Sequence, residues 1–257
     1  MNGKNIEDLS TKGYTVIRNW VSEAWLNRIK EILPRLFEEH KAIREHNNNG
    51  INSDEVAMNV LASDDFFIEF LQEMDDRYLI DDIESHYFKE DCILNSFTAI
   101  SNIAAESSVF YKQMHRDIKR YSNSVPILLN MLVMVDDFTE ENGGTLLLPY
   151  SHLREKKPTE EFWEKNNVSI EGKAGDIIVW NSNIFHASGV NKTNQNRRGL
   201  PITFSLPYYK QLLDYPRALG YERESEFSLK IQRLLGYHSR VPESIEEWYI
   251  PSNTDKY

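Results

Sequence analysis

From about residue 93 onward, turn-rich pieces such as ENGG, GKAGD and NKTNQN divide the chain into short apolar or alternating runs. Short runs rich in β-branched and aromatic residues are typical of strands. Many short strands separated in this way indicate a sandwich, a barrel or a jelly roll. We therefore expect strands over residues 93–103, 127–135, 145–149, 169–170, 177–180 and 202–206.

The residues before this region follow a mainly helical pattern. A short strand over 13–18 precedes Ser22, a suitable N-cap for a helix whose apolar residues continue to about residue 40. Pro34 lies inside that helix and removes a backbone hydrogen bond, so we expect a kink or a break. Residues 46–52 (HNNNGIN) should be irregular. Further helices are expected from Ser63-Asp64-Asp65 onward, over 78–88 and, in the tail, over 226–235.

No repeat or low-complexity linker divides the sequence, so we expect residues 1–257 to form a single domain. Its class is mainly β with flanking helices, in which an N-terminal helical layer covers a β core. The tail over 235–249 is expected to complete the core or, alternatively, to cap the pocket.

Composition limits the partners and the compartment. The net charge of −11 has the wrong sign for a large nucleic-acid footprint. Cys92, the single cysteine, excludes an internal disulfide and a cysteine-rich zinc site. The first residues (MNGKNIEDLSTKGYTVI) carry acidic side chains where a secretion signal would need a basic region and an apolar run, so we expect none. No run approaches the roughly 20 apolar residues that span a bilayer. We expect a cytoplasmic protein that binds neither nucleic acid nor membrane, whereas its oligomeric state stays open.

Two histidines and an aspartate form a candidate metal site. His115 and Asp117 are separated by one residue, so on an extended strand both side chains would point to the same face. His186 follows the apolar run 177–180, and a closed β structure could bring it across the core. Two imidazoles and one carboxylate form the facial triad of non-heme Fe(II) oxygenases, although geometry must exclude Zn(II) or Ni(II). The plain alternative is a surface pair of His115 with Asp117 and a packed His186.

A candidate anion site follows the third ligand. Arg197 comes after the loop-like stretch 191–196 and before the expected strand over 202–206. The guanidinium is a rigid donor fork that matches a carboxylate in a bidentate pair. It could therefore hold the far carboxylate of 2-oxoglutarate, whose keto-acid end would chelate iron. Arg198 competes for this role, and if the strand begins this early the two arginines point to opposite sides.

At these residues the chain resembles the phytanoyl-CoA dioxygenase family of Fe(II)- and 2-oxoglutarate-dependent oxygenases. GYTVIRNWVSEAWLNRIKEIL is similar to the family's opening strand and helix, and QMHRD to its His-x-Asp segment. DDFTEENGGTLLLPYSH resembles its Asn-Gly turn with Pro-x-Ser-His, and AGDIIVWNSNIFHASGVNKTNQNRR its distal histidine and arginine. The resemblance extends over residues 13–208. It implies a double-stranded β-helix of the jelly-roll, cupin-like type with N-terminal helices.

The resemblance also implies roles for individual residues. The family places its arginine eleven residues after the distal histidine, which selects Arg197 over Arg198. Ser188 and Thr145 become candidates for contacts to the keto acid, although Ser188 could equally shape a turn and Thr145 could equally begin a strand. Further candidates for lining the pocket are Gln113, Asn130 and Trp180.

Two positions depart from the family pattern. Arg116 stands inside His-x-Asp where glutamine is frequent, and Tyr150 stands where glycine is usual. Neither of these two departures removes a ligand. Asp117 matches the pattern and argues against halogenation, because related halogenases have glycine or alanine there.

The sequence therefore predicts a dioxygenase that uses Fe(II), 2-oxoglutarate and O2 and releases succinate and CO2. Its reaction is most simply hydroxylation of a C–H bond in a small metabolite or a natural-product intermediate. A desaturase or cyclase would use the same ligands. An acyl-CoA hydroxylase would need a basic patch that the sequence does not reveal. A redox-inert jelly-roll metalloprotein and a noncatalytic binding domain are the alternatives from other classes.

Overall fold

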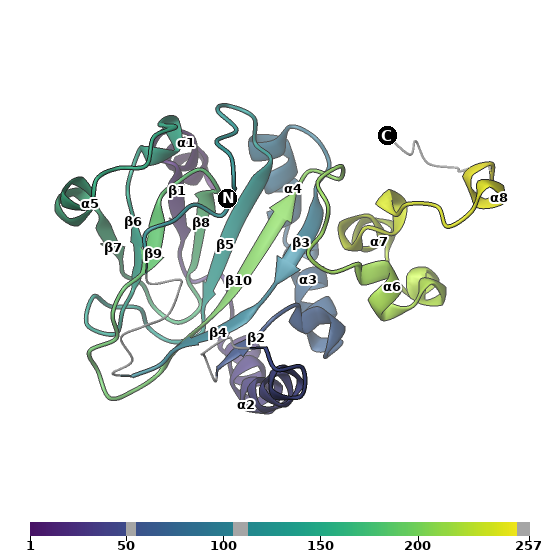
Figure 1. Cartoon of the computed structure of the whole chain (residues 1–257), viewed down its shortest axis with the longest axis horizontal. Coiled ribbons are helices and arrows are strands. Elements are labelled where there is room, and N and C mark those ends of the chain that lie inside the picture. The colour runs from purple at the N-terminus through teal and green to yellow at the C-terminus, as the bar shows by residue number, and fades with distance from the viewer. Residues whose placement is uncertain (50–54, 105–112, 251–257) are drawn as a thin grey trace.

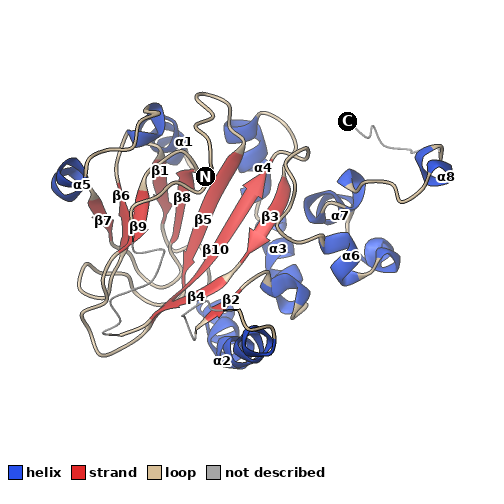
Figure 2. Cartoon of the chain, viewed as in Figure 1, coloured by secondary structure: helices blue, strands red, loops and turns tan. Residues whose placement is uncertain are grey.

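The computed structural model describes residues 1–49, 55–104 and 113–250, and its strands form two antiparallel sheets (Figures 1 and 2). In the large sheet the spatial order is β1-β8-β5-β10-β4-β2, with β3 also paired to β10, and in the small sheet it is β7-β6-β9. The strands are β1 (Tyr14–Ile17), β2 (Val56–Ala57), β3 (Ile93–Phe97), β4 (Ala99–Asn102), β5 (Leu128–Met134), β6 (Thr145–Leu147), β7 (Val168–Ile170), β8 (Ile177–Asn181), β9 (His186–Ser188) and β10 (Arg197–Ser205).

Helices flank these sheets, and most of them precede β3 or follow β10 (Figure 2). The α-helices are α1 (Gly3–Lys12), α2 (Glu23–His46), α3 (Phe66–Asp76), α4 (Leu79–Ile83), α5 (Glu160–Asn166), α6 (Tyr215–Leu219), α7 (Leu229–Leu235) and α8 (Ile245–Trp248). The shorter turns are η1 (Val60–Ala62), η2 (Glu84–Phe88), η4 (Ser151–Leu153), η5 (Tyr221–Glu226) and η6 (Tyr237–Ser239). The expected mainly β chain with an N-terminal helical layer is thus confirmed.

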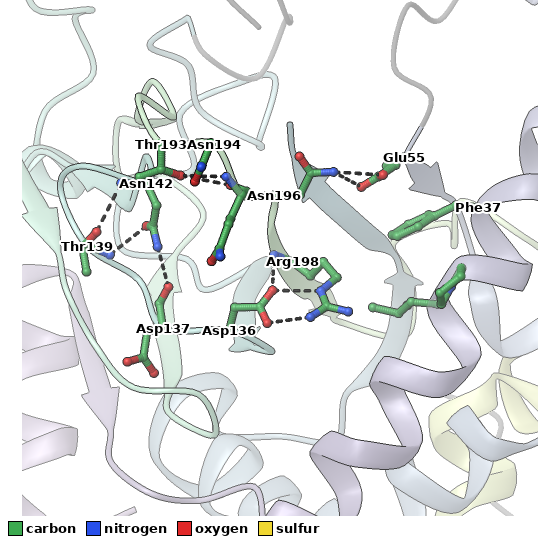
Figure 3. A pocket seen from close by; sticks show the side chains of 13 residues that line it. Phe37, Glu55, Asp136, Asp137, Thr139, Asn142, Thr193, Asn194, Asn196 and Arg198 are labelled. Carbon is green, nitrogen blue, oxygen red and sulfur yellow. Dashed lines mark hydrogen bonds and ion pairs between the residues drawn. The ribbon is translucent and has the colours of Figure 1, made fainter. Parts of the chain in front are cut away.

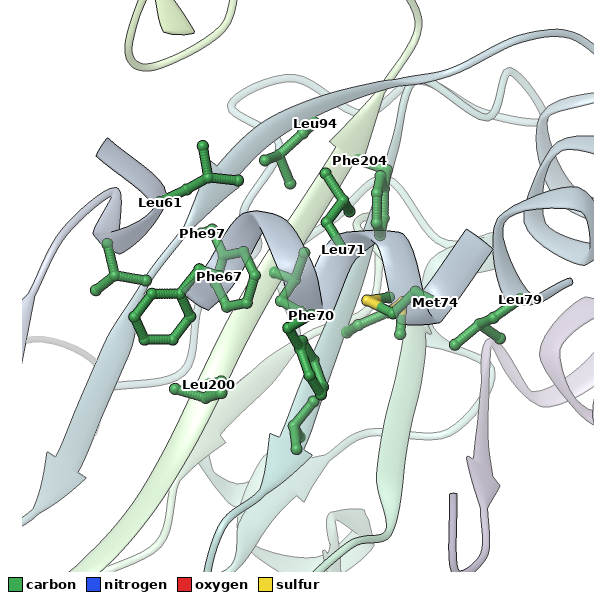
Figure 4. Close-up of a cluster of buried hydrophobic side chains, with 14 of the residues drawn as sticks. Leu61, Phe67, Phe70, Leu71, Met74, Leu79, Leu94, Phe97, Leu200 and Phe204 are labelled. Carbon is green, nitrogen blue, oxygen red and sulfur yellow. The ribbon is translucent and has the colours of Figure 1, made fainter. Parts of the chain in front are cut away.

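The outer face of the large sheet packs against the helices. Alternate residues of β10, from Leu200 to Phe204, point to this face and belong to the main hydrophobic core. Figure 4 shows α3 lying across the sheet, with Phe67 and Phe70 directed toward the strands and Phe97 beside them. Burying each such side chain contributes about 1.5–3 kcal/mol, so this layer supplies much of the stability of the fold.

The inner face of the large sheet packs against the small sheet through a second, smaller core. Leu132 of β5 and Ile178 of β8 meet Leu147 of β6 and Ile170 of β7 there. Residues one position along each strand point the other way, to the helices. The molecule therefore has three layers, helices, large sheet and small sheet, and the inner face of the large sheet is where a site between the sheets can form.

The long N-terminal helix confirms its expected start but not the break. The Ser22 hydroxyl accepts a hydrogen bond from the Trp25 amide at 3.4 Å, as an N-cap does. The helix α2 then continues through Pro34 to His46 without interruption. One missing hydrogen bond is outweighed because Ile29, Leu33 and other residues of the same face are buried. Of the expected irregular segment, residues 50–52 lie outside the described chain.

Two strand predictions need correction. The single strand expected over 93–103 is two strands, β3 and β4, which pair with successive parts of β10. The strand β10 begins at Arg197, not at residue 202. The local pattern did not predict this earlier start, because the first residues of the strand follow a polar, loop-like stretch. Pro201 is tolerated in this central strand because it lies between the residues that pair with β4 and those that pair with β3.

The C-terminal tail divides into two parts. The helix α7 begins at Leu229 after its cap Ser228, not at residue 226 as expected, and it packs against β3 and α3. Tyr237 is buried beside it, so this part completes the core. The helix α8, in contrast, lies at the opposite end of the molecule from β9 and does not cap the predicted site (Figure 1). Within the described ranges, no helix has the length and apolar character needed to cross a membrane.

Candidate metal centre

The three predicted ligands meet at one point. His115 and His186 form an antiparallel bridge, in which each backbone N–H donates to the other's carbonyl at 3.0 and 2.9 Å. Asp117 Oδ1 lies 3.5 Å from His115 Nε2, and Asp117 Oδ2 lies 3.3 Å from His186 Nε2. The candidate ligand atoms all lie within 4.8 Å of one another. We expected His115 and Asp117 on one extended strand, but only His115 pairs, and Asp117 lies in the bend that follows.

Both histidines present the same nitrogen to this point. His115 Nδ1 lies 2.7 Å from the carbonyl oxygen of Gln113, and His186 Nδ1 lies 3.2 Å from that of Ile184. A carbonyl only accepts, so each Nδ1 carries a proton, and in the neutral ring Nε2 then has the lone pair that faces Asp117. Histidine ligands of metals are commonly oriented in this way. Gln113, expected to line the pocket, thus contributes through its backbone.

The electrostatics of the cluster fit a divalent cation. Burial raises the pKa of Asp117, but the two imidazoles outweigh burial and hold that pKa below its ordinary value. Burial lowers the pKa of His186 and so favours its neutral form. Burial acts likewise on His115, but Asp117 and the Gln113 carbonyl raise its pKa more. A charged carboxylate beside imidazoles of fixed orientation is the donor set that non-heme Fe(II) prefers.

Asn130 and Trp180 lie behind the aspartate. Asn130 Nδ2 donates to Asp117 Oδ2 at 2.8 Å and to Ser182 Oγ at 3.0 Å. Trp180 is the cross-strand partner of Asn130, and its ring centroid lies 5.4 Å from that of His186. Its buried Nε1 has no hydrogen-bond partner of ordinary geometry in the described chain, yet it lies close enough to Asp117 to help lower its pKa. Asn130 of β5 therefore contacts Asp117, and Trp180 of β8 lies against His186, both from the large sheet.

The predicted 2-oxoglutarate residues form a second cluster next to the ligands. Arg197 is 2% exposed, and its Nη2 donates to Ser188 Oγ at 3.0 Å and to the Gly143 carbonyl at 2.8 Å. Ser188 follows His186 by two residues on β9, so both side chains point to the same face. Thr145 of β6 is the cross-strand partner of Ser188. The structure thus brings Arg197, Ser188 and Thr145 together beside the candidate metal ligands.

Sequence reasoning missed Asn102, which joins this cluster. It pairs with Arg197 across β4 and β10, and its Nδ2 lies 3.1 Å from Ser188 Oγ. The same amide donates to the carbonyls of Gly143 and Gly189 at 3.2 and 2.9 Å. A Cβ on Gly143 would lie 2.4 Å from it, so the close approach requires glycine. The Asn-Gly turn was the available signal, but its partner depends on the register of β4 with β10.

Arg198 points to the opposite side of β10, as an early strand start predicts. It donates to Asp136 from its backbone and from its guanidinium, at 2.7 to 2.9 Å. Both side chains line an outer cavity of about 1020 Å³ that also includes Phe37 of α2 and Asn196 (Figure 3). No member of the histidine–aspartate cluster lines this cavity, and many of its polar groups bond one another. This cavity is therefore separate from the candidate metal centre.

Both departures from the family pattern have a structural account. The Arg116 guanidinium lies 4.0 Å from the Phe185 ring centre and donates to the carbonyls of Glu155 and Ser151 at 2.8 and 3.3 Å. It therefore fastens the ligand segment to residues 151–155 rather than entering the ligand cluster. Tyr150 has a φ of 63°, the left-handed conformation that glycine adopts most easily. A non-glycine residue there costs about 1–2 kcal/mol.

Comparison with known proteins identifies the family. Residues 9–199 match the family described as phytanoyl-CoA dioxygenase. The chain belongs to this family. It is therefore an Fe(II)- and 2-oxoglutarate-dependent dioxygenase, with Fe(II) as its cofactor and 2-oxoglutarate as its co-substrate.

Relatives at the level of sequence include characterised and uncharacterised proteins. An uncharacterised protein of Mycobacterium tuberculosis is 28% identical, and the alignment covers 97% of this chain and 92% of that protein. The dioxygenase FUM3 of Gibberella moniliformis is 30% identical over 51% of this chain and 45% of its own length. The similarity to a named dioxygenase thus covers about half of each chain.

Solved structures share the fold. The epimerase SnoN, determined with Fe3+, α-ketoglutarate and nogalamycin RO, has a TM-score of 0.63 and 14% identity over 80% of this chain and 85% of its own. EctD from S. alaskensis, determined with 2-oxoglutarate and 5-hydroxyectoine, has a TM-score of 0.65 and 17% identity over 80% and 76%. These similarities confirm the predicted double-stranded β-helix, or jelly roll.

Proposed function

We propose that this dioxygenase holds Fe(II) through His115, Asp117 and His186 and hydroxylates a C–H bond of a small metabolite or a natural-product intermediate. The observation that carries the proposal is the ligand cluster itself, whose atoms lie within 4.8 Å of one another. When bound, iron and 2-oxoglutarate supply the oxidation of a C–H bond by O2, with release of succinate and CO2.

The protein's own contribution is orientation and charge. The Gln113 and Ile184 carbonyls hold the two imidazoles with Nε2 toward the metal. Arg197, buried beside Ser188, offers a cation to the far carboxylate of 2-oxoglutarate. A charge-assisted pair is strong at such a site because little water competes for either charge. The hydroxyls of Ser188 and Thr145 are proposed to contact the same molecule.

The substrate class is narrowed by cations beside the centre. Arg116 joins the segment that contains Asp117 to residues 151–155, so residues 116–120 and 151–157 lie side by side. The exposed cations of these two segments have no ion pair with any described carboxylate, and they are Lys119, Arg120, Arg154, Lys156 and Lys157. The charge of Lys157 is near enough to the centre to oppose, weakly, the rise in the pKa of His115 that Asp117 and the Gln113 carbonyl cause. On a chain of net charge −11, this favours a substrate that carries a carboxylate or a phosphate.

This basic patch also strengthens the acyl-CoA alternative, which the sequence alone left without support. The two segments are separated along the chain, so only the fold reveals that they are neighbours. Desaturation and cyclisation would use the same ligands and remain alternative outcomes of the reaction. We further propose that residues 1–257 act as one domain in the cytoplasm, without nucleic-acid or membrane partners.

Succinate release in the presence of candidate substrates tests the proposal. We expect acidic metabolites to stimulate release more than their methyl esters or amides. Lys156→Gln with Lys157→Gln should reduce that stimulation, whereas Lys89→Gln, in the helical layer, should not. If folded, iron-loaded protein releases no more succinate than its Asp117→Ala variant under any condition, the enzymatic proposal is wrong. Equal stimulation by the acids and by their esters would refute only the proposed substrate class and would leave the enzymatic proposal unaffected.

A further inference from the structure

Asn130 lies at the centre of a hydrogen-bond network that ends on a candidate ligand. It is 3% exposed, on the inner face of β5. Its amide nitrogen donates to Asp117 Oδ2 and to Ser182 Oγ, at 2.8 and 3.0 Å. Its amide oxygen accepts from Thr203 Oγ1 at 2.9 Å. Both N–H groups and the oxygen of this amide are therefore engaged.

The network permits a single orientation of the amide. A charged carboxylate only accepts hydrogen bonds, so the group that faces Asp117 must be the nitrogen. Turning the amide would place its oxygen against the carboxylate, so that two acceptors faced each other without a hydrogen bond. Thr203 is the cross-strand partner of Asn130 in β10, and Trp180 is its partner in β8. The registers of three adjacent strands thus fix how this amide is oriented.

The amide holds one oxygen of Asp117 while both oxygens face the histidines. Oδ2 receives the Asn130 hydrogen bond and lies 3.3 Å from His186 Nε2, while Oδ1 lies 3.5 Å from His115 Nε2. A carboxylate oxygen has more than one lone pair, so Oδ2 can accept this bond and still bind a metal. The amide therefore fixes the direction of the carboxylate toward both imidazoles.

We infer that Asn130 is a positioning residue that holds the Asp117 carboxylate toward His115 and His186, so that the three candidate ligands converge on one point. The inference rests on the proposed ligand set. It assigns a function to a polar network, Asn130 with Ser182 and Thr203, that would otherwise be an ordinary buried hydrogen-bond cluster. Removing an outer partner of this kind typically weakens metal affinity by about 10- to 100-fold.

The test uses Mn(II) as the probe and needs no substrate. Its dissociation constant is measured by electron paramagnetic resonance titration. We expect Asn130→Leu to raise the dissociation constant by about 10- to 100-fold. Thr203→Val, nearly isosteric, should raise it less. Circular dichroism establishes that each variant is folded.

A matched control separates this role from ordinary structural support. Asn95 of β3 is also buried, at 4% exposure, and its amide donates to Ser205 Oγ and to the Lys210 carbonyl, away from the ligands. Asn95→Leu should lower thermal stability and leave Mn(II) affinity as in the wild type. Unchanged Mn(II) affinity in Asn130→Leu would overturn the inference. If Asn130→Leu does not fold, the same result in Thr203→Val decides against it.

Asp117→Ala distinguishes this failure from failure of the ligand set. If Asp117→Ala binds Mn(II) as tightly as the wild type, the proposed ligand is wrong and Asn130 has no ligand to position. If Asp117→Ala loses binding while Asn130→Leu keeps it, the ligand stands and only the role of Asn130 is refuted.

Discussion

The two faces of the large sheet use the same strands for opposite purposes. On the outer face, Leu200 and Phe204 of β10 pack into a nearly continuous apolar core under the helices. On the inner face, Arg197 and Thr203 of the same strand join polar clusters around the candidate metal centre. Successive residues of β10 point to opposite faces, so one contributes to the apolar core and the next to the polar clusters around the candidate site.

This difference shows where stability and function are separated. The outer face gains stability from burial of apolar area, which tolerates changes of shape but not loss of volume. The inner face buries amides, hydroxyls and a guanidinium, each of which is costly unless it has partners. Substitutions on the outer face should therefore alter unfolding, and those on the inner face should alter binding and turnover.

The largest effect is expected at the ligands. His115→Ala and Asp117→Ala should each abolish 2-oxoglutarate-dependent succinate release, because the remaining groups cannot retain iron in the required geometry. Circular dichroism should remain close to that of the wild type, since these side chains add little to either core. Turnover at the wild-type level in either variant would refute the ligand assignment.

The outer face should respond in the reverse way. Phe70 is 0% exposed and packs against the rings of Trp25 and Phe97. Phe70→Ala should lower the free energy of unfolding by about 3–5 kcal/mol, measured by denaturant titration. The folded fraction should bind Mn(II) as the wild type does. A selective loss of metal affinity, with little loss of stability, would contradict the division between the faces.

Neighbouring arginines provide a sharper comparison. Arg197→Gln should weaken 2-oxoglutarate binding by about 1.5–3 kcal/mol, because it removes a hydrogen-bonded charge pair. Arg198→Gln, one residue further along β10, should leave that affinity unchanged, since its side chain bonds Asp136 on the outer side. Calorimetric titration of 2-oxoglutarate into the metal-loaded protein measures both. A larger loss of 2-oxoglutarate affinity in Arg198→Gln than in Arg197→Gln would assign the anion site to Arg198 instead.

The smallest effect is expected at the outer ion pair. Burial raises the pKa of Asp136, but the bonds from Arg198 outweigh burial and lower that pKa below 3.8. A lowered folded-state pKa adds stability above the unfolded value, and that stability is lost as the pH falls through the folded value. Asp136→Asn should cost up to about 1 kcal/mol at pH 7, and the difference should disappear in acid. A difference that grows below pH 3.8 would contradict this sign.

Much of the outer face could be predicted from the sequence. The periodicity of α2, the aromatic residues of α3 and the strands β5 and β8 all follow from local patterns of apolar residues. Of the kink or break expected at Pro34, the break does not occur, because tertiary burial outweighs one lost hydrogen bond. Local patterns thus suffice where a whole face of an element is buried in one core.

The inner face was only partly predictable. His115, Asp117, His186 and Arg197 carry recognisable chemistry and spacing, so the sequence singled them out. Asn102 and the role of Asn130 depend on which residues of β4, β5, β8 and β10 face one another, and that register is not encoded in a local pattern. The polar stretch before Arg197 likewise concealed that β10 begins there.

The most direct test of the ligand assignment is the visible absorption of the protein with Fe(II) and 2-oxoglutarate under anaerobic conditions. The account predicts a weak charge-transfer band in the wild type and in Arg198→Gln, and its loss in His115→Ala, Asp117→Ala and His186→Ala. Absence of the band in folded, iron-loaded wild-type protein would contradict the account, as would an unchanged band in the three ligand variants.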